Sequence, residues 1–244
     1  MREIKMRYVN HRGDVFTFGE KAGAYLCDFD ELLSYEHPIQ PKDVKLTVVF
    51  DGTVPESRGR FFQIIEVDSL AEKEGELWFD DYFIKGRVIG GDTTLHYGSG
   101  EMTKEIKFSM QRPIWTRGVT KLYERTQTKA LIINEGFFES PVMIEAFGAA
   151  DGFSVSIGDS NYDVAQAIPE NSRLVVNGLA KTIELIGEDG SVQNALSKRE
   201  GEQVKDSGYY VFQKIPPGVS ELTWRHSKRI RITIFEQTSE PRWE

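Results

Sequence analysis

The chain is poor in residues that build covalent or metal-bound frameworks. It has one cysteine, Cys27, so no disulfide can form within it. We interpret Cys27 as a small buried residue rather than a reactive thiol, and we expect synthesis in a reducing compartment. The histidines His11, His37, His96 and His226 lie far apart, and none has a second histidine or cysteine at ligand spacing. We therefore expect no metal and no cofactor.

Long apolar runs and an excess of positive charge are also missing. No segment approaches the roughly 18 apolar residues that cross a bilayer. The opening MREIKMRYVNHRG has neither the apolar core nor the cleavage site of a secretory signal, so we expect no membrane insertion. The formal net charge of −8 argues against general affinity for nucleic acid, which needs clustered lysine and arginine. The hydrophobic share of 39% is that of a globular protein.

Signatures of catalysis are absent as well. There is no G-x-S-x-G nucleophile motif, and GSG at 98–100 lacks the lysine and the helix of a phosphate-binding loop. A glycosidase needs two carboxyl groups about 5 to 9.5 Å apart, and close carboxylates do occur at 27–31 and 78–82. However, Asp80 and Asp81 fall at an expected hairpin tip, where turn geometry alone favours aspartate. We predict that the chain is not an enzyme, and a hydrolase is the weakest of three hypotheses.

What the sequence does contain is a succession of short strands separated by turn residues. The segment KLTVVF, 45–50, is rich in β-branched residues and ends at Asp51-Gly52, a strong turn signal. The Arg-Gly-Asp triplet at 12–14 falls between two expected strands, so we interpret it as a turn rather than an adhesion motif. Two hairpins are expected next, formed by 76–79 with 82–89 and by 93–97 with 105–110.

One segment of the first half has a helical period. In SRGRFFQIIEVDSLAEKEG, 57–75, apolar residues recur at the spacing of one helix face. Ser57 is the expected N-cap, and Gly75 follows a charged last turn. This pattern predicts the one helix of the N-terminal half.

The second half predicts a β-sandwich or jelly roll, because seven or more short strands follow one another with Gly, Asn or Asp in nearly every gap. Asn177-Gly178 is the expected turn of a hairpin, whereas 189–200 is expected to be a loop with a helical turn. We expect an N-terminal β-rich domain over 1–125 and a C-terminal sandwich domain over 126–244. The expected strands of the second domain are PVMIEAFG, FSVSIG, SRLVVNG, KTIELIG, GYYVF, ELTW and RIRITIF.

The chain closes with a basic segment that also carries tryptophan, 216–244, which we expect to form a last hairpin at an edge of the sandwich. Trp224 is in phase with Leu222, so both are expected to face inward, and Trp243 is expected to be a second packing anchor. Isoleucines at 230, 232 and 234 alternate with polar residues, which predicts one buried and one solvated face. The basic residues are interpreted as a solvated face or a subunit contact; they are Arg225, Lys228, Arg229, Arg231 and Arg242.

The order of several motifs resembles a known family. The chain opens with IKMRYVNHRGDVFTFG and continues with FFQIIEVDSLAEKEGELWFDDYFIKGRVIGG and KEIKFSMQRPIWTR. It closes with VNGLAKTIELIGEDGSVQNALSKRE, YYVFQKIPPGVSELTW and IRITIFEQTSEPRW. This succession resembles the distal tail proteins of long-tailed phages, the siphophage tail-component family. The resemblance covers nearly the whole chain, most clearly about 76–117 and 172–243.

The resemblance implies a structural hub at the virion tail tip of a siphovirus-like phage or prophage, assembled in the host cytoplasm. It implies an N-terminal domain that builds a hexameric ring and a galectin-like C-terminal domain that projects outward. The implied partners are the tail tube protein, a tail-associated fibre or lysin protein, and a receptor-binding protein at the periphery. DNA would pass through the lumen without specific binding. No catalytic residues transfer from the family, and the second half is long enough for one jelly roll only.

A carbohydrate-binding module that recognises host cell-wall polysaccharide is the alternative from another class. Such a module needs exposed aromatic rings, whereas strand aromatics usually pack in the core. Sequence alone cannot sort the candidates, which are Phe137, Phe138, Phe153, Tyr162, Tyr209 and Tyr210.

Overall fold

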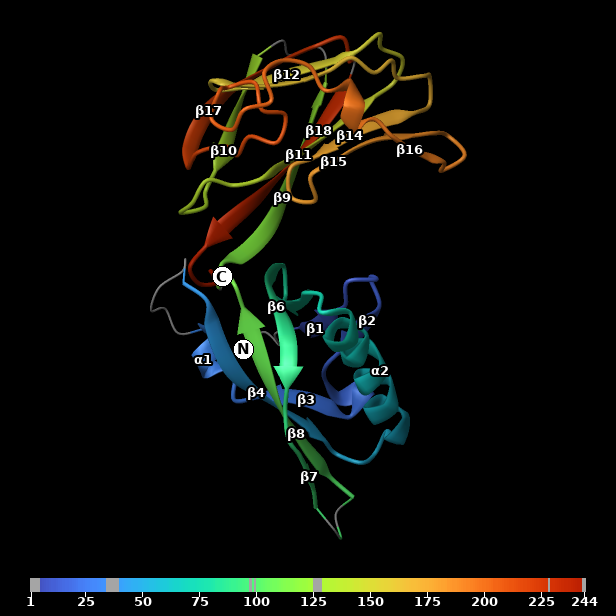
Figure 1. Ribbon diagram of the computed structural model, residues 1–244, viewed down its shortest axis with the longest axis vertical. Coiled ribbons are helices and arrows are strands. Elements are labelled where there is room, and N and C mark those ends of the chain that lie inside the picture. Colours follow the sequence, from blue (N-terminus) through green and yellow to red (C-terminus); the bar gives the residue numbers. More distant parts are fainter. Residues whose placement is uncertain are drawn as a thin grey trace. The chain divides into compact units, whose positions relative to one another are not determined.

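The structure is a computed structural model that describes residues 5–33, 40–96, 98, 100–124, 129–227 and 229–242. It confirms the mainly β class expected from the sequence (Figure 1). The chain divides into two compact units. Unit 1 comprises the described residues up to Thr116 and from Thr238 onward, and unit 2 comprises Arg117–Gln237. Within the described residues, no helix has both the length and the apolar character needed to cross a membrane.

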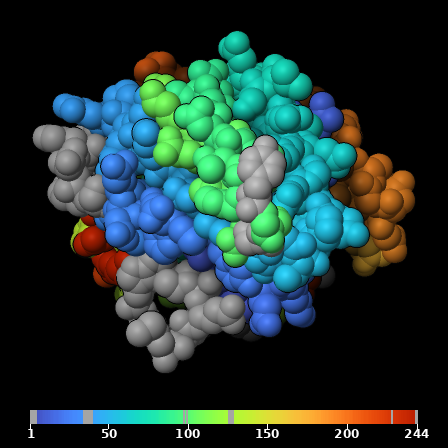
Figure 2. All heavy atoms as spheres, turned by 90° about the horizontal axis from the view of Figure 1, so that it is seen from below, coloured from blue at the N-terminus to red at the C-terminus, as the bar shows by residue number. Residues whose placement is uncertain are grey.

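Unit 1 is an antiparallel β-structure with one long helix. Its strands follow the neighbour order β2, β1, β5, β6, β8, β4, β3, and the short β7 pairs with the beginning of β8. In Figure 2 the blue N-terminal segments, the cyan residues of α2 and the green residues of β8 share one face of this unit. Its elements in chain order are β1 (Met6–Val9), β2 (Val15–Thr17), η1 (Glu20–Ala22), β3 (Ala24–Cys27), α1 (Asp30–Leu33), β4 (Lys42–Phe50), α2 (Pro55–Ala71), β5 (Gly75–Phe79), β6 (Tyr82–Gly90), β7 (Thr93–Leu95) and β8 (Met102–Met110).

Helix α2 confirms the predicted helix but not its predicted ends. It starts at Pro55, because proline lacks an N–H that the first turn would leave unbonded anyway. Ser57 therefore lies inside the first turn and is not the N-cap. The helix ends at Ala71, the C-cap Glu72 has a left-handed φ of 52°, and Gly75 already belongs to β5. The short α1 is a second helix of this half, which the sequence analysis did not predict.

The core of unit 1 lies between α2 and the strands. Phe61 of α2 is fully buried and makes edge-to-face contacts with Phe16 at 5.1 Å and with Phe50 at 5.3 Å. The alternation in β4 buries every second residue from Val44 to Phe50, as expected for a strand with one core-facing side. Leu70 of α2, by contrast, is exposed.

Unit 2 is a sandwich of two antiparallel sheets around one core (Figure 1). One sheet has the order β16, β15, β14, β11, β18, β9, and the other has the order β10, β17, β12, β13. Its elements are β9 (Trp115–Glu124, of which Trp115 and Thr116 lie in unit 1), β10 (Lys129–Asn134), β11 (Val142–Phe147), β12 (Phe153–Ile157), β13 (Ser160–Val164), β14 (Arg173–Asn177), β15 (Thr182–Ile186), β16 (Val192–Asn194), η2 (Leu196–Lys198), β17 (Gly218–Arg225) and β18 (Arg229–Thr238).

The prediction of a last edge hairpin is wrong. β17 lies between β10 and β12 in one sheet, and β18 lies between β11 and β9 in the other. The inward-facing residues were predicted correctly, since Leu222, Trp224 and the isoleucines of β18 are all buried in one core. Two strands that face one core from opposite sides belong to opposite sheets. The turn between them is a corner of the sandwich, with His226 at a left-handed φ of 71°.

Three local expectations for unit 2 also need correction. The segment GYYVF, 208–212, runs through turns and irregular backbone, and its apolar character reflects the burial of Val211 and Phe212 in the core. The β14–β15 hairpin exists, but Asn177 pairs with Thr182, so four residues separate the strands. The Asn177 side chain accepts bonds from the amides of Leu179 and Ala180. The expected loop 189–200 contains a short strand, β16, besides the helical turn η2.

Candidate functional site

The basic strand at the end of the chain places arginines on the outer face of unit 2. We name this surface the arginine face and define it by Glu145, Phe147, Arg173, Arg229 and Arg231. Its register is fixed, because β11 pairs with β18 on one side and with β14 on the other. Glu145 therefore lies directly opposite Arg231, and Phe147 lies opposite both Arg173 and Arg229.

Glu145 is the electrostatic centre of the arginine face. One of its oxygens accepts a bond from Arg231 at 3.1 Å, and the other lies 3.6 Å from Arg173. The Glu145 side chain is 10% exposed, whereas the two arginine side chains are 43% and 44% exposed. A nearly buried carboxylate between two partly solvated guanidinium groups holds three neighbouring strands in one arrangement.

Phe147 adds a second kind of contact. The guanidinium groups of Arg229 and Arg231 lie 4.9 Å and 5.1 Å from its ring centre, which is cation–π distance. Arg229 itself is exposed, and a hollow of about 300 Å³ lies beside it, lined also by Phe147 and Arg173. The arginine face thus presents the exposed Arg229 beside the partly exposed Arg173 and Arg231, an arrangement that suits contact with an acidic surface.

The other residues of the basic segment do not join this surface as a group. Arg225 is exposed on β17, in the opposite sheet, and Arg242 is exposed in unit 1. Lys228 and Trp243 lie outside the described residues. Trp224 is 8% exposed and packs 6.0 Å from the ring of Tyr123, as expected for a packing anchor.

The histidines do not converge. His11 binds Asp68, His96 lies 3.1 Å from the hydroxyl of Thr103, and His226 is at the sandwich corner. His37 lies outside the described residues. In the part of the chain that the structure describes, no three His, Cys, Asp or Glu side chains gather as metal ligands would. Cys27 is half-buried, less deeply than predicted, and burial together with the nearby Asp28 raises the pKa of its thiol.

The turn interpretations of the acidic and Arg-Gly-Asp motifs are confirmed. Asp80 sits at a left-handed φ of 50° between β5 and β6, and its carboxylate accepts the amide of Lys5 at 3.0 Å. The triplet at 12–14 forms the turn between β1 and β2. Asn10 closes that turn, because its side-chain oxygen accepts the amides of Arg12 and Asp14.

The candidate sugar-binding aromatics are scattered by the fold. Phe153 and Tyr162 are buried in the core of unit 2, and Phe138 and Tyr210 are half-buried. Phe137 and Tyr209 are 60% and 50% exposed. No aromatic platform for a sugar therefore follows from the six candidates.

Sequence reasoning missed a buried polar cluster in unit 1. Asp68 of α2 has no exposed surface and accepts the hydroxyl of Tyr8 at 2.6 Å, the amide of His11 at 2.9 Å and a bond with the His11 ring at 2.5 Å. A side chain at Gly75 would collide with both Tyr8 and Asp68. A signal was present, because Asp68 continues the apolar stripe of Phe61, Ile64 and Ile65 at helical spacing, where an aspartate needs partners.

The fold as a whole, two mainly β units of which the second is a two-sheet sandwich, is similar to the folds of solved proteins from phage tails and baseplates. The solved structure of the SPP1 Dit (gp 19.1) protein, described as a paradigm of the hub adsorption apparatus in phages that infect Gram-positive hosts, has a TM-score of 0.53 and 12% identity. The match covers 97% of this chain and 89% of that one.

Two structures of the phage P2 baseplate in its activated conformation match as well. The one with calcium has a TM-score of 0.60 at 10% identity, and the one with strontium has 0.62 at 9%. Both matches cover 98% of this chain and 100% of the other. No protein-family model matches the sequence, and no curated protein matches it significantly. The resemblance to phage distal tail proteins is thus confirmed in the fold.

Proposed function

We propose that the chain is a structural hub of a phage or prophage tail tip. The observation that carries the proposal is the extent of the fold match, which includes both units and all of the phage P2 baseplate chain. A match of the sandwich alone would support only a β-sandwich module, because that fold serves many functions. Agreement in both units and in their order supports a common role in a tail assembly.

In this proposal unit 1 builds a hexameric ring, and unit 2 projects from it. One side of the ring joins the tail tube protein, and the other joins the tail-associated fibre or lysin protein, with receptor-binding protein at the periphery. Six identical chains close a ring through a single heterologous interface repeated six times. The arginine face is a surface through which unit 2 would meet an acidic neighbour.

The first test is the mass in solution. We expect light scattering behind a sizing column to give six times 27.8 kDa, about 167 kDa, and negative-stain images of that peak to show rings. The measurement is made with and without the tail tube protein, because a ring can need its neighbour in order to close. A chain that stays monomeric at all concentrations in both conditions contradicts the ring.

The proposal also predicts no saturable binding on a glycan array. A plain hub has no sugar site, and the fold scatters the candidate aromatic residues. Saturable binding to one polysaccharide class, lost when Phe137 or Tyr209 is replaced by alanine, would instead support the carbohydrate-binding alternative.

A further inference from the structure

Five side chains form a row across five neighbouring strands on the outer face of unit 2. The strands β16, β15, β14, β11 and β18 lie side by side in that order (Figure 1). Residues directly opposite each other in antiparallel strands have their side chains on the same face, so the register defines the row. We name it the cross-strand row, and its members in strand order are Val192, Ile186, Arg173, Phe147 and Arg229.

The cross-strand row is open to solvent. Val192 is 62% exposed, and Arg173 and Arg229 are exposed as well. Ile186 and Phe147 are half-buried, and no member of the row belongs to the core of unit 2. The hollow of about 300 Å³ in the arginine face is lined by every member of the row except Val192. Apolar and cationic side chains therefore meet solvent together along one strip of the sheet.

The two arginines of the row are positioned by neighbours but not neutralised by them. The guanidinium group of Arg229 lies 4.9 Å from the ring centre of Phe147, and in the described part of the chain it forms no ion pair with a carboxylate. Arg173 lies 3.6 Å from Glu145, which also binds Arg231. One carboxylate shared by two arginines leaves positive charge at the row.

Two further carboxylates limit the kind of anion that fits. Glu170 is exposed and lines the same hollow, and Glu184 lies one row further along β15, opposite Val175. A nucleic acid carries a charged phosphate at every nucleotide, so it would meet these carboxylates and the apolar members of the row as well as the arginines. A protein segment can place its carboxylates at the arginines alone and apolar side chains between them.

The spacing of the row matches one face of an α-helix. Neighbouring strands lie about 4.8 Å apart, so Arg229 and Arg173, two strands apart, start from backbone positions separated by about 10 Å. Residues i and i+7 of a helix share one face and are separated by a rise of about 10.5 Å. Residues of a strand that share a face recur every 6.6 Å or so, which does not match the row. A helix lying across the strands therefore fits better than an extended segment.

We propose that the cross-strand row binds an acidic amphipathic helix of a partner protein. Carboxylates at positions i and i+7 of that helix lie against Arg229 and Arg173. Apolar side chains at i+3, i+10 and i+14 lie on Phe147, Ile186 and Val192. The inference deepens the contact with an acidic neighbour proposed above for unit 2, and it rests on the proposed hub only for the kind of assembly that supplies the partner.

The test uses the full chain and three synthetic peptides in titration calorimetry. The matched peptide is a capped, alanine-rich helix with glutamate at i and i+7 and leucine at i+3, i+10 and i+14. The second peptide carries the same glutamates at i+2 and i+9, on the opposite helix face, and the third has glutamine in place of glutamate. We expect the matched peptide to bind about tenfold more tightly than either of the others, because only it makes both charge-assisted contacts.

Substitutions locate the binding. Arg229→Gln and Arg173→Gln should each weaken the matched peptide about tenfold, since each removes one charge-assisted contact. Glu170→Gln removes a repelling charge beside the row and should tighten the binding. Arg225→Gln removes an exposed arginine of β17, in the opposite sheet, and should leave the affinity unchanged. Because Arg229 is exposed and has no carboxylate partner among the described residues, its replacement tests the site without disturbing the fold.

Three results would overturn the proposal. The first is equal binding of the three peptides, or no binding of any of them at millimolar concentration. The second is equal binding of the matched peptide and of a version with proline in its middle, which would assign the row to an extended segment. The third is a single-stranded oligonucleotide that binds more tightly than the matched peptide and displaces it, which would make the row a nucleic-acid surface.

Light scattering of the Arg229→Gln and Arg173→Gln variants separates this surface from the ring. We expect both variants to keep the mass of the unchanged chain, because the row faces a partner protein and not a second copy. Loss of the ring in both variants would assign the row to the contact between copies and overturn the proposal. An unchanged chain that stays monomeric but binds the matched peptide contradicts the ring and supports the helix site.

Discussion

At the scale of single residues, Asp68 connects three segments of unit 1 that are far apart in the sequence. Tyr8 comes from β1 and His11 from the turn that follows it, while Asp68 comes from α2. Gly75 of β5 leaves the space that the cluster fills. Burying a carboxylate costs free energy unless hydrogen-bond donors surround it. These contacts are therefore needed for the folded state of unit 1 to be stable.

Replacing Asp68 by alanine should lower the free energy of unfolding by about 2–3 kcal/mol, because the buried hydroxyl of Tyr8 and the part-buried amide of His11 lose their acceptor. Urea unfolding at constant m-value measures the change. Glu66→Ala, on the exposed side of the same helix, is the matched control and should change stability by no more than about 0.5 kcal/mol. Equal effects of both substitutions would contradict a structural role for the cluster.

Two buried tyrosines predict a loss of stability at alkaline pH. Burial raises the pKa of Tyr162, and burial with the bond to Asp68 raises the pKa of Tyr8, both above the ordinary value of 10.0. Below pH 10 both tyrosines are protonated in the folded and unfolded chain. Above pH 10 the two phenol groups lose their protons in the unfolded chain but keep them in the folded chain. Each tyrosine therefore lowers the free energy of unfolding by roughly 1.4 kcal/mol per pH unit.

Urea unfolding between pH 9 and 11 measures this alkaline slope. Tyr162→Phe should make it shallower by one tyrosine's share, at the cost of the 2.9 Å hydrogen bond to the carbonyl of Gln213. Tyr209→Phe, at a half-exposed position, is the matched control. An unchanged slope in Tyr162→Phe would mean that this phenol also ionises in the folded chain.

At the scale of elements, periodicity predicted what each segment is but not what lies beside it. The helical spacing of 57–75 found α2, yet its start depends on Pro55 and its end on the left-handed Glu72. Alternation in β17 and β18 predicted the buried side chains correctly. It could not predict the partner strands, because alternation defines the buried face of a strand and carries no information about its neighbours.

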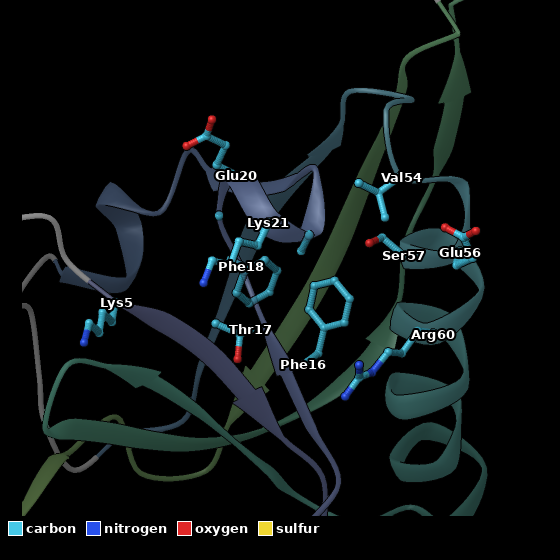
Figure 3. Close-up of a pocket in the computed structure, with 12 residues that line it drawn as sticks. Lys5, Phe16, Thr17, Phe18, Glu20, Lys21, Val54, Glu56, Ser57 and Arg60 are labelled. Carbon is cyan, nitrogen blue, oxygen red and sulfur yellow. The ribbon is translucent and has the colours of Figure 1, made fainter.

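The same limit applies to the candidate surface. The alternation of Arg229 and Arg231 predicted an outward basic face, but Glu145 comes from a strand more than eighty residues away. Phe147 likewise becomes a partner only through the β11–β18 register. A cavity of about 800 Å³ in unit 1 is lined by residues of β2, η1 and the first turn of α2 (Figure 3). A cavity formed by three separate elements cannot be predicted from a local pattern in the sequence.

The link among β11, β14 and β18 predicts a measurable coupling. Glu145→Gln should lower the free energy of unfolding by about 1 kcal/mol, because a neutral amide replaces a carboxylate between two arginines. A double-mutant cycle with Arg231→Gln should give a coupling of about 0.5–1 kcal/mol. Lys129→Gln, which removes the cation of an exposed pair with Glu221, is the control. Zero coupling would mean that Glu145 and Arg231 act independently.

At the scale of the whole molecule, the two units differ in continuity. Unit 2 is one uninterrupted stretch, Arg117–Gln237, with its own core. Unit 1 is completed by the segment from Thr238 onward, in which Thr238 and Pro241 are buried.

We therefore expect the fragment 117–237 to unfold cooperatively by itself, with the emission of a buried Trp224 before the transition. The fragment 1–116 lacks the segment from Thr238 onward, which we call the returning segment because it brings the chain back to unit 1. This fragment should therefore be less stable than unit 1 in the full chain. Urea unfolding of both fragments and of the full chain, followed by fluorescence and circular dichroism, checks this. A 117–237 fragment without a cooperative transition would contradict the autonomy of unit 2.

The returning segment has a consequence for how such genes can diversify. Because the chain leaves unit 1 once and comes back to it once, unit 2 is bounded by only two junctions. Recombination at those two points could exchange the whole cassette between genomes while both flanking sequences remain in frame. Under the proposed hub role, such an exchange would replace unit 2 in one step and leave the sequence of unit 1 unchanged.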